Sequence, residues 1–167
     1  MTKTPKTIPE FSLAVQYGIE DKQLPRWRLR RWVAVALAGA VANTDTADLQ
    51  HIVLTIRLVG QREGKMLNQT YRHKDYATNV LTFQYDSAPD CQSTVMADIV
   101  ICTPVLKREA REQSKSYLHH AAHLVIHGTL HALGHDHLHA RDANVMESLE
   151  KRILARLGMP NPYGSET

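Results

Sequence analysis

The part of this sequence richest in chemically active side chains reads HGTLHALGHDH, residues 127–137. Its histidines His127, His131 and His137 follow the spacing H-x3-H-x5-H, with two glycines between them. On a helix, the first two of these histidines lie one turn apart on the same face, so both imidazoles can reach one ion. Three neutral imidazole nitrogens with an open fourth position are typical of a catalytic zinc site.

The third histidine reaches the same ion only if the helix stops before it. The sequence predicts a helix over 116–133, and Gly134 is placed to end it, because glycine readily adopts the left-handed conformation that follows many helices. A turn over 134–136 would then bring His137 back over the helix end. The helical periodicity also predicts two opposite faces, one packed in the core and one carrying histidines. Their members are Leu118, Ala122, Val125, Ala132 and Leu133 on the core face, and His120, His123, His127 and His131 on the other.

A glycine at position 128 separates this stretch from the H-E-x-x-H helix of metalloproteases. In that motif the glutamate is the general base for metal-bound water. Gly128 cannot accept a proton, which disfavours a peptidase. Metal binding alone can still lower the pKa of a bound water, so hydrolysis that needs charge neutralisation stays open. The absent side chain is also expected to leave room for approach to the metal.

Two other interpretations of the histidines are compatible with their spacing. The H-x3-H pattern occurs several times in this segment, so the histidines could form an exposed helix face that binds no metal. A structural zinc ion is the second alternative, and it would need a fourth ligand. The candidates for that ligand are Cys102, His135 and His139.

The elements that would position these residues alternate along the chain. Strands are predicted near 11–17, 51–59, 79–85 and 96–102, and helices near 25–43, 62–72, 104–113, 116–133 and 141–157. The strand over 51–59 has the clearest pattern, with an apolar residue at every second position. With 167 residues, the chain suits a single domain over 1–167, of class α/β (α+β), with a mixed sheet of about four strands.

Composition restricts the surroundings in which the protein works. The longest apolar run, residues 32–42, is too short to cross a bilayer, and the N-terminus has no apolar signal region, so a cytoplasmic protein is expected. The two cysteines, Cys91 and Cys102, are expected to be free thiols. A net charge of +3 permits a polyanionic partner without requiring one.

Two blocks of the sequence resemble the YbeY family of bacterial endoribonucleases, which act in ribosomal RNA maturation. The family's metal stretch reads approximately H-G-x-L-H-L-x-G-Y-D-H, against HGTLHALGHDH here. A second family block, L-N-x-x-Y-R-x-K-D-x-x-T-N-V-L-S-F, matches LNQTYRHKDYATNVLTF at 67–83. With weaker matches to ADIVIC and LGMPNPY, the resemblance covers roughly residues 50–163. The sequence departs from the family pattern at Thr82, Ala97, Ala132 and His135. None of these departures removes one of the three motif histidines.

The resemblance implies a site and a substrate. His127, His131 and His137 would be zinc ligands, and Arg72 would act in catalysis or substrate engagement. The fold would be an α/β sandwich with the metal in a cleft. The substrate would be single-stranded RNA, including the 3′ end region of small-subunit ribosomal RNA, with a role in ribosome quality control. Ribosomal proteins of the small subunit, or assembly factors such as ribosome-associated GTPases, would be partners.

Arg72 also has a physical reason to act on RNA. A phosphodiester transition state gathers negative charge, and a guanidinium fork matches phosphate oxygens better than an ammonium does. The alternative for this side chain is a salt bridge, for example with Asp75. The acid/base residue stays open between Asp136 and His135. Beside the endoribonuclease, two further hypotheses are a ribosome-assembly RNA-binding protein with a mainly structural metal, and a metallopeptidase.

Overall fold

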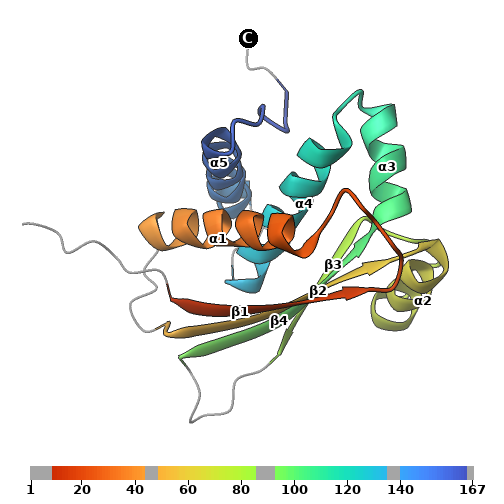
Figure 1. Ribbon diagram of the computed structural model, residues 1–167, viewed down its shortest axis with the longest axis horizontal. Coiled ribbons are helices and arrows are strands. Elements are labelled where there is room, and N and C mark those ends of the chain that lie inside the picture. Colours follow the sequence, from red (N-terminus) through yellow and green to blue (C-terminus); the bar gives the residue numbers. More distant parts are fainter. Residues whose placement is uncertain (1–8, 44–48, 86–92, 135–139, 165–167) are drawn as a thin grey trace, which may run out of the picture.

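The computed structural model describes residues 9–43, 49–85, 93–134 and 140–164, which form a four-stranded sheet and five helices (Figure 1). In chain order the elements are β1 (Glu10–Tyr17), α1 (Arg26–Asn43), β2 (His51–Val59), α2 (Gln61–Arg72), β3 (Val80–Tyr85), β4 (Thr94–Cys102), α3 (Thr103–Glu112), α4 (Tyr117–Ala132) and α5 (Ala140–Arg156). The predicted α/β class with a mixed sheet of about four strands is therefore confirmed.

The sheet has the strand order β1-β2-β4-β3. β1, β2 and β4 run parallel, and β3 pairs antiparallel with β4 at one edge. In this register Ile99 of β4 lies between Ile56 of β2 and Thr82 of β3. Because side chains alternate between the two faces of a strand, this row belongs to one face of the sheet.

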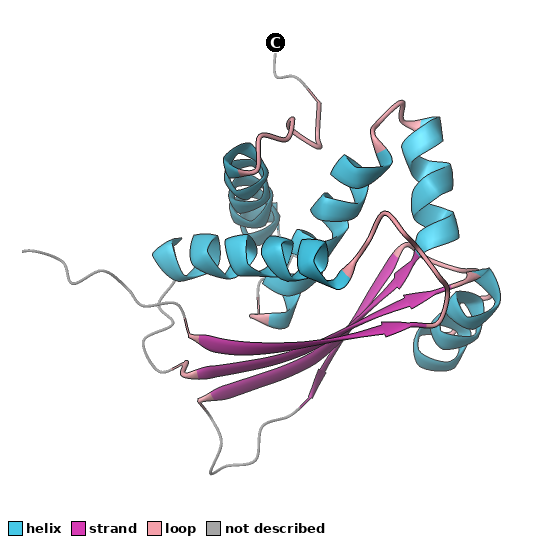
Figure 2. Cartoon of the chain, in the orientation of Figure 1, coloured by secondary structure: helices cyan, strands magenta, loops and turns pink. Residues whose placement is uncertain are grey.

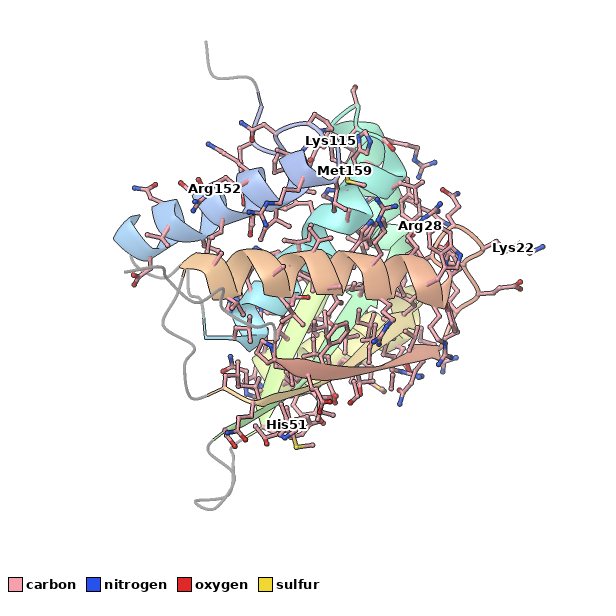
Figure 3. All side chains as sticks on the ribbon, turned by 60° about the vertical axis from the view of Figure 1, so that its left-hand side comes forward. Lys22, Arg28, His51, Lys115, Arg152 and Met159 are labelled. Carbon is pink, nitrogen blue, oxygen red and sulfur yellow. The ribbon has the colours of Figure 1, made fainter. Side chains whose placement is uncertain are left out.

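Helices α1, α4 and α5 lie on one side of the sheet, where α4 contacts β3 and β4 and α5 packs on α1 and α4 (Figures 1 and 2). The apolar residues of β2 lie beneath them and are buried, as the alternating pattern predicts. Helix α2 instead packs at one end of the sheet, where its Leu67 contacts a small apolar cluster that contains Leu81 and Val100. In Figure 3, exposed charged side chains such as Lys22 and Arg152 lie on the outside of the molecule.

The longest apolar run of the sequence lies in α1 and is used for packing inside the protein. Trp32, Val33 and Leu37 are buried in the main core, where α1 contacts α4 and α5. The burial is consistent with the expectation that this run does not enter a membrane. None of the helices in the described residues is long and apolar enough to cross one.

Helix α4 is the centre of the helical layer, and its environment corrects one prediction. The histidine face was expected to point away from the core, yet His120 is only 5% exposed and its Nε2 lies 3.2 Å from Oε1 of Glu109 on α3. The reason is tertiary: α3 and α5 pack against α4 and cover the side that the periodicity left free. Most of the helix is therefore buried on more than one side.

Gly128 serves close packing between α4 and the sheet. A Cβ built at this position would lie 2.8 Å from Cγ2 of Ile99 on β4, closer than carbon atoms normally approach. The expectation that this glycine leaves room for approach to a metal is therefore wrong, because the side chain of Ile99 fills the space next to it. A glutamate at 128, as in the protease motif, would have to displace β4 or the helix.

Candidate metal and active site

A cleft of about 180 Å³ lies at the β3 edge of the sheet, between this strand, the end of α2 and the last turns of α4. Its lining residues are Arg72, Thr78, Asn79, Val80, Thr82, His127 and His131. The structure thus brings Arg72 into one cleft with two of the three histidines from the H-x3-H-x5-H pattern, although more than fifty positions separate them in the chain.

The spacing of His127 and His131 fits a shared metal ion. Their ring centroids are 5.5 Å apart. An imidazole that binds zinc at about 2.1 Å has its centroid about 3.2 Å from the ion, so two tetrahedral imidazole ligands have centroids about 5 Å apart. Only a small adjustment of the two side chains is needed for both to reach one ion. The chemistry of this donor set, neutral nitrogen, suits zinc and its transition-series neighbours.

The end of α4 follows the predicted plan. The helix stops at Ala132, and Gly134 has a φ of 95°, in the region that glycine adopts freely. Nε2 of Gln84 on β3 donates a 2.6 Å hydrogen bond to the carbonyl of His131 in the last turn of the helix, and the backbone N–H of Gly134 donates to the same carbonyl at 3.0 Å. His137 lies outside the described residues, as do Asp136, His135 and His139, so the third ligand stays a prediction.

Arg72 is the last residue of α2, and its side chain is exposed at the rim of the cleft. The chain turns sharply after it, because His73 adopts a left-handed conformation with φ 59°. Asp75, the proposed salt-bridge partner, instead lies 3.5 Å from Nζ of Lys65. In the part of the chain that the structure describes, Arg72 forms no ion pair, which leaves the guanidinium available to an anion in the cleft.

Asn79 organises the turn that leads into β3. Its Oδ1 accepts a 2.7 Å hydrogen bond from the backbone N–H of Val80, and its Nδ2 donates to both carboxylate oxygens of Glu109 at 3.1 and 3.3 Å. Glu109 in turn contacts His120. The side chain of Asn79 is thus engaged with protein groups, and its place in the cleft wall is fixed by α3.

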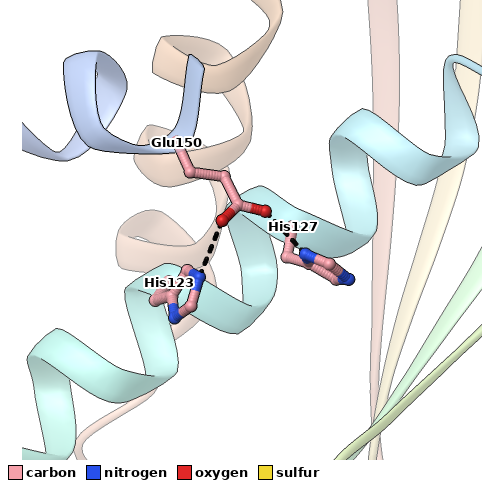
Figure 4. A group of neighbouring side chains, drawn as sticks. All are labelled: His123, His127 and Glu150. Carbon is pink, nitrogen blue, oxygen red and sulfur yellow. Dashed lines mark hydrogen bonds and ion pairs between the residues drawn. The ribbon is translucent and has the colours of Figure 1, made fainter. Parts of the chain in front are cut away.

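A second group of polar side chains lies behind His127 and was missed by the sequence analysis. Nδ1 of His127 is 2.6 Å from Oε1 of Glu150 on α5, and Nε2 of His123 is 2.9 Å from Oε2 of the same carboxylate (Figure 4). The hydroxyl of Tyr163 donates a hydrogen bond to Oε2 as well. His123, His127 and Glu150 form a group of residues that could hold a metal ion.

Burial and hydrogen bonding act in opposite directions on Glu150. The residue is fully buried. Burial alone would raise the pKa of its carboxyl, but hydrogen bonds from His123 and His127 prevail and lower this pKa to about 2. The pKa of Tyr163 is raised. Burial of the phenol is the largest cause, and the hydrogen bond that its hydroxyl donates to Glu150 is the next.

One signal in the sequence could have found Glu150. In the predicted helix over 141–157 it shares the apolar face with Met146, Leu149 and Ile153, all of which are buried. A carboxylate is almost never fully buried unless it has partners, so an acid on such a face indicates a polar network or a site. The partners themselves come from α4 and from the segment after α5, which no local pattern connects.

Comparison with known proteins identifies the family. The family model described as Endoribonuclease YbeY matches residues 15–158. The chain belongs to the YbeY family. A relative from Bordetella avium named Endoribonuclease YbeY is 58% identical over 155 residues, covering 93% of this chain and 94% of its own. Another of that name, from Burkholderia lata, is 49% identical over 162 residues, covering 93% of this chain and 87% of its own.

A solved structure supports the fold of this YbeY family member. The solution structure of a Thermotoga maritima protein superimposes with a TM-score of 0.55 at 20% sequence identity, covering 88% of this chain and 92% of that one. At this identity the likeness concerns the fold alone. The resemblance predicted from the two sequence blocks is confirmed, and so, for the family, is the expectation of a hydrolase that acts on RNA.

Proposed function

We propose that this protein is a zinc-dependent endoribonuclease that cleaves single-stranded RNA during ribosomal RNA maturation, at the 3′ end of the small-subunit RNA, and that it contributes to ribosome quality control in the cytoplasm. The observation that carries the proposal is the cleft in which Arg72 lies with His127 and His131. Membership of the YbeY family, whose named relatives are endoribonucleases, supports the substrate class.

His127 and His131, with His137 as the third ligand, would hold the zinc ion. The 5.5 Å separation of the first two rings supports this assignment. A zinc ion bound there would supply a Lewis acid and a water of lowered pKa. The protein's part is to hold the two imidazoles one turn apart on α4, a helix whose end is tied to Gln84 of β3.

Arg72 would bind the phosphate whose ester bond is cut. Its planar guanidinium can pair with two phosphate oxygens at once. This interaction becomes stronger in the transition state, because the oxygens then carry more negative charge. Lys74 follows two residues later and is exposed, so a second cation lies close to Arg72 in the chain. A net charge of +3 also favours encounter with a polyanion.

No side chain at position 128 can act as a base, and the buried Gly128 faces Ile99 instead. The protein therefore has to obtain its proton transfer from another residue. Asp136 and His135 are the two candidates that the sequence offers. Small-subunit ribosomal proteins and assembly factors are the proposed partners that would deliver the RNA end.

The test is cleavage of a defined, end-labelled single-stranded RNA, with the same sequence in a duplex as the substrate control. We expect the protein as purified to contain zinc and to cut the single strand, and we expect His131→Ala and Arg72→Ala to lose this activity. Arg62→Ala is the matched control, because Arg62 is an exposed arginine of α2 outside the cleft lining.

If Arg72→Ala and His131→Ala cut as well as the parent, the assignment of the site is wrong. If the protein binds RNA but never cuts it, and zinc removal unfolds it, the ribosome-assembly binding protein with a structural metal is the better account. Peptide hydrolysis that depends on His127 would instead revive the metallopeptidase.

A further inference from the structure

We propose that Glu150 is a positioning residue rather than a metal ligand: it accepts the hydrogen bond of His127 Nδ1–H and thereby directs Nε2 of His127 to the metal in the cleft. The inference rests on the proposed zinc site and concerns how this chain prepares one of its ligands. It also decides between two arrangements that share His127, the cleft pair with His131 and the buried group with His123 and Glu150.

The distances within the buried group are those of hydrogen bonds. Nδ1 of His127 and Oε1 of Glu150 are 2.6 Å apart. Two ligand atoms of one tetrahedral zinc ion, each about 2.0–2.1 Å from it, are about 3.3 Å apart. A metal ion between these atoms would have to push the ring and the carboxylate apart by about 0.7 Å in the densely packed interior between α4 and α5.

The carboxylate is also saturated by donors from three directions. Oε1 faces His127, while Oε2 accepts from Nε2 of His123 at 2.9 Å and from the hydroxyl of Tyr163. Tyr163 follows α5 and lies with its ring edge-on to His123 at 5.4 Å between centroids. A fully buried carboxylate with three donors has the partners that its burial requires, without a cation.

This hydrogen bond fixes the tautomer of His127. A carboxylate is only an acceptor, so the ring nitrogen that faces it has to carry the proton. In the neutral imidazole the other nitrogen, Nε2, then keeps its lone pair, which is the form that binds a metal. In Figure 4 this second nitrogen of His127 points away from Glu150. His127 also lines the cleft that holds His131 and Arg72.

The anchoring of Glu150 makes the orientation rigid. Its backbone belongs to α5, its second oxygen is held by His123 one turn before His127 on α4, and Tyr163 closes the group from the segment after α5. The ring of His127 therefore has little rotational freedom before a metal arrives. Such outer hydrogen-bond partners of a ligand typically change metal affinity 10–100-fold when they are removed.

Replacement of the carboxylate by an amide tests this role with little change in volume. In Glu150→Gln one oxygen of the carboxylate becomes an NH₂ donor, which cannot satisfy both His123 and His127 in their present forms. We expect the zinc affinity of the full-length protein, measured by competition with a chromophoric chelator, to fall about 10–100-fold. Glu147→Gln, one turn earlier on α5, is the matched control and should bind zinc like the parent.

A second measurement reports on the tautomer directly and needs no variant. In ¹⁵N-labelled, metal-free protein, long-range ¹H–¹⁵N spectra should show His127 protonated at Nδ1 and unprotonated at Nε2. In Glu150→Gln this signature should shift toward the opposite tautomer or a mixture. Tyr163→Phe, which keeps the carboxylate and removes one donor to it, should weaken zinc binding less than Glu150→Gln does.

The outcomes separate the inference from the proposed function. If His131→Ala abolishes zinc binding while Glu150→Gln leaves affinity and tautomer unchanged, the positioning role is refuted and the zinc site stands. If zinc binding survives His131→Ala but is lost in His123→Ala, the metal lies in the buried group, and both the inference and the proposed zinc site are wrong. X-ray absorption of the zinc-loaded parent that shows a Glu150 oxygen in the coordination shell would also overturn the inference.

Discussion

Gly128 lies where α4 crosses β4, and its replacement by alanine tests the packing that carries the two cleft histidines. The added Cβ would be 2.8 Å from Cγ2 of Ile99. Carbon atoms in contact are normally about 3.5–4.0 Å apart, so the helix or the strand has to yield by about 0.7–1.2 Å. Ile99 cannot simply rotate away, because a β-branched side chain is stiff and this one is fully buried.

Two effects of Gly128→Ala oppose one another. Alanine in place of glycine inside a helix stabilises it by about 1 kcal/mol. Overpacking of a well-filled core costs about 1–3 kcal/mol, and the short contact to a rigid neighbour places this site in the upper part of that range. We therefore expect the free energy of unfolding to fall by about 1–2 kcal/mol. Urea unfolding of the metal-free protein, followed by circular dichroism, measures it.

A double-mutant cycle isolates the contact. Ile99→Ala removes Cγ2 and should by itself cost about 2–5 kcal/mol. In the double variant, the alanine at 128 meets the space that Ile99 has vacated, so the overpacking cost of Gly128→Ala should vanish. The coupling energy between the two changes should therefore equal that overpacking cost, about 1–3 kcal/mol. If Gly128→Ala is as stable as the parent or more so, or if the two changes are additive, close helix–strand packing is not the reason for this glycine.

Three further predictions concern the site and its surroundings. Arg72→Ala should lower the cleavage rate about 10²–10³-fold, as loss of one preorganised charge contact does, while Arg62→Ala stays near the parent in the same assay. Removal of the metal by a chelator should stop cleavage but leave the far-ultraviolet circular dichroism of the protein intact, and coincident unfolding would contradict a purely catalytic metal. Burial lowers the pKa of His120, although Glu109 acts against this shift. The folded state therefore favours the neutral ring of His120. The resulting stabilisation is fully present above the ordinary histidine pKa of about 6.5 in the unfolded chain, and it is lost as the pH falls from there toward the lower pKa of His120 in the folded protein. His120→Gln should accordingly reduce the loss of unfolding free energy between about pH 7 and 5, and an unchanged pH dependence would refute the assignment to His120.

Local patterns predicted the elements well because each element carries its own signal. The strand over 51–59 alternates apolar residues at every second position, and it was predicted with the bounds that the structure gives to β2. The helix predicted over 116–133 was found over Tyr117–Ala132, since Gly134 supplies the stop. The pairing of Arg72 with the histidines in one cleft came from the family resemblance, because no local pattern relates α2 to α4.

Tertiary covering is what the sequence patterns could not supply. A helical face with several histidines resembles a solvated face, and only the position of α3 and α5 shows that His120 and His123 are enclosed. Glu150 is the clearest case, because its role depends on donors that come from α4 and from Tyr163. A buried acid could have been suspected from the apolar face of α5, but its partners could not.

The two halves of the proposed active site are held by consecutive residues of one strand. Ile99 of β4 faces the helical layer and contacts the position of Gly128 on α4, whereas Val100 faces the opposite side and belongs to the cluster that packs Leu67 of α2. Because successive side chains of a strand point to opposite faces, β4 fixes the helix that carries His127 and His131 and, independently, the helix that ends at Arg72. The cleft opens at the neighbouring β3 edge, between the end of α2 and the last turns of α4. A substitution that displaces β4 should therefore change the separation of the arginine from the histidines, even though no residue of β4 lines the cleft.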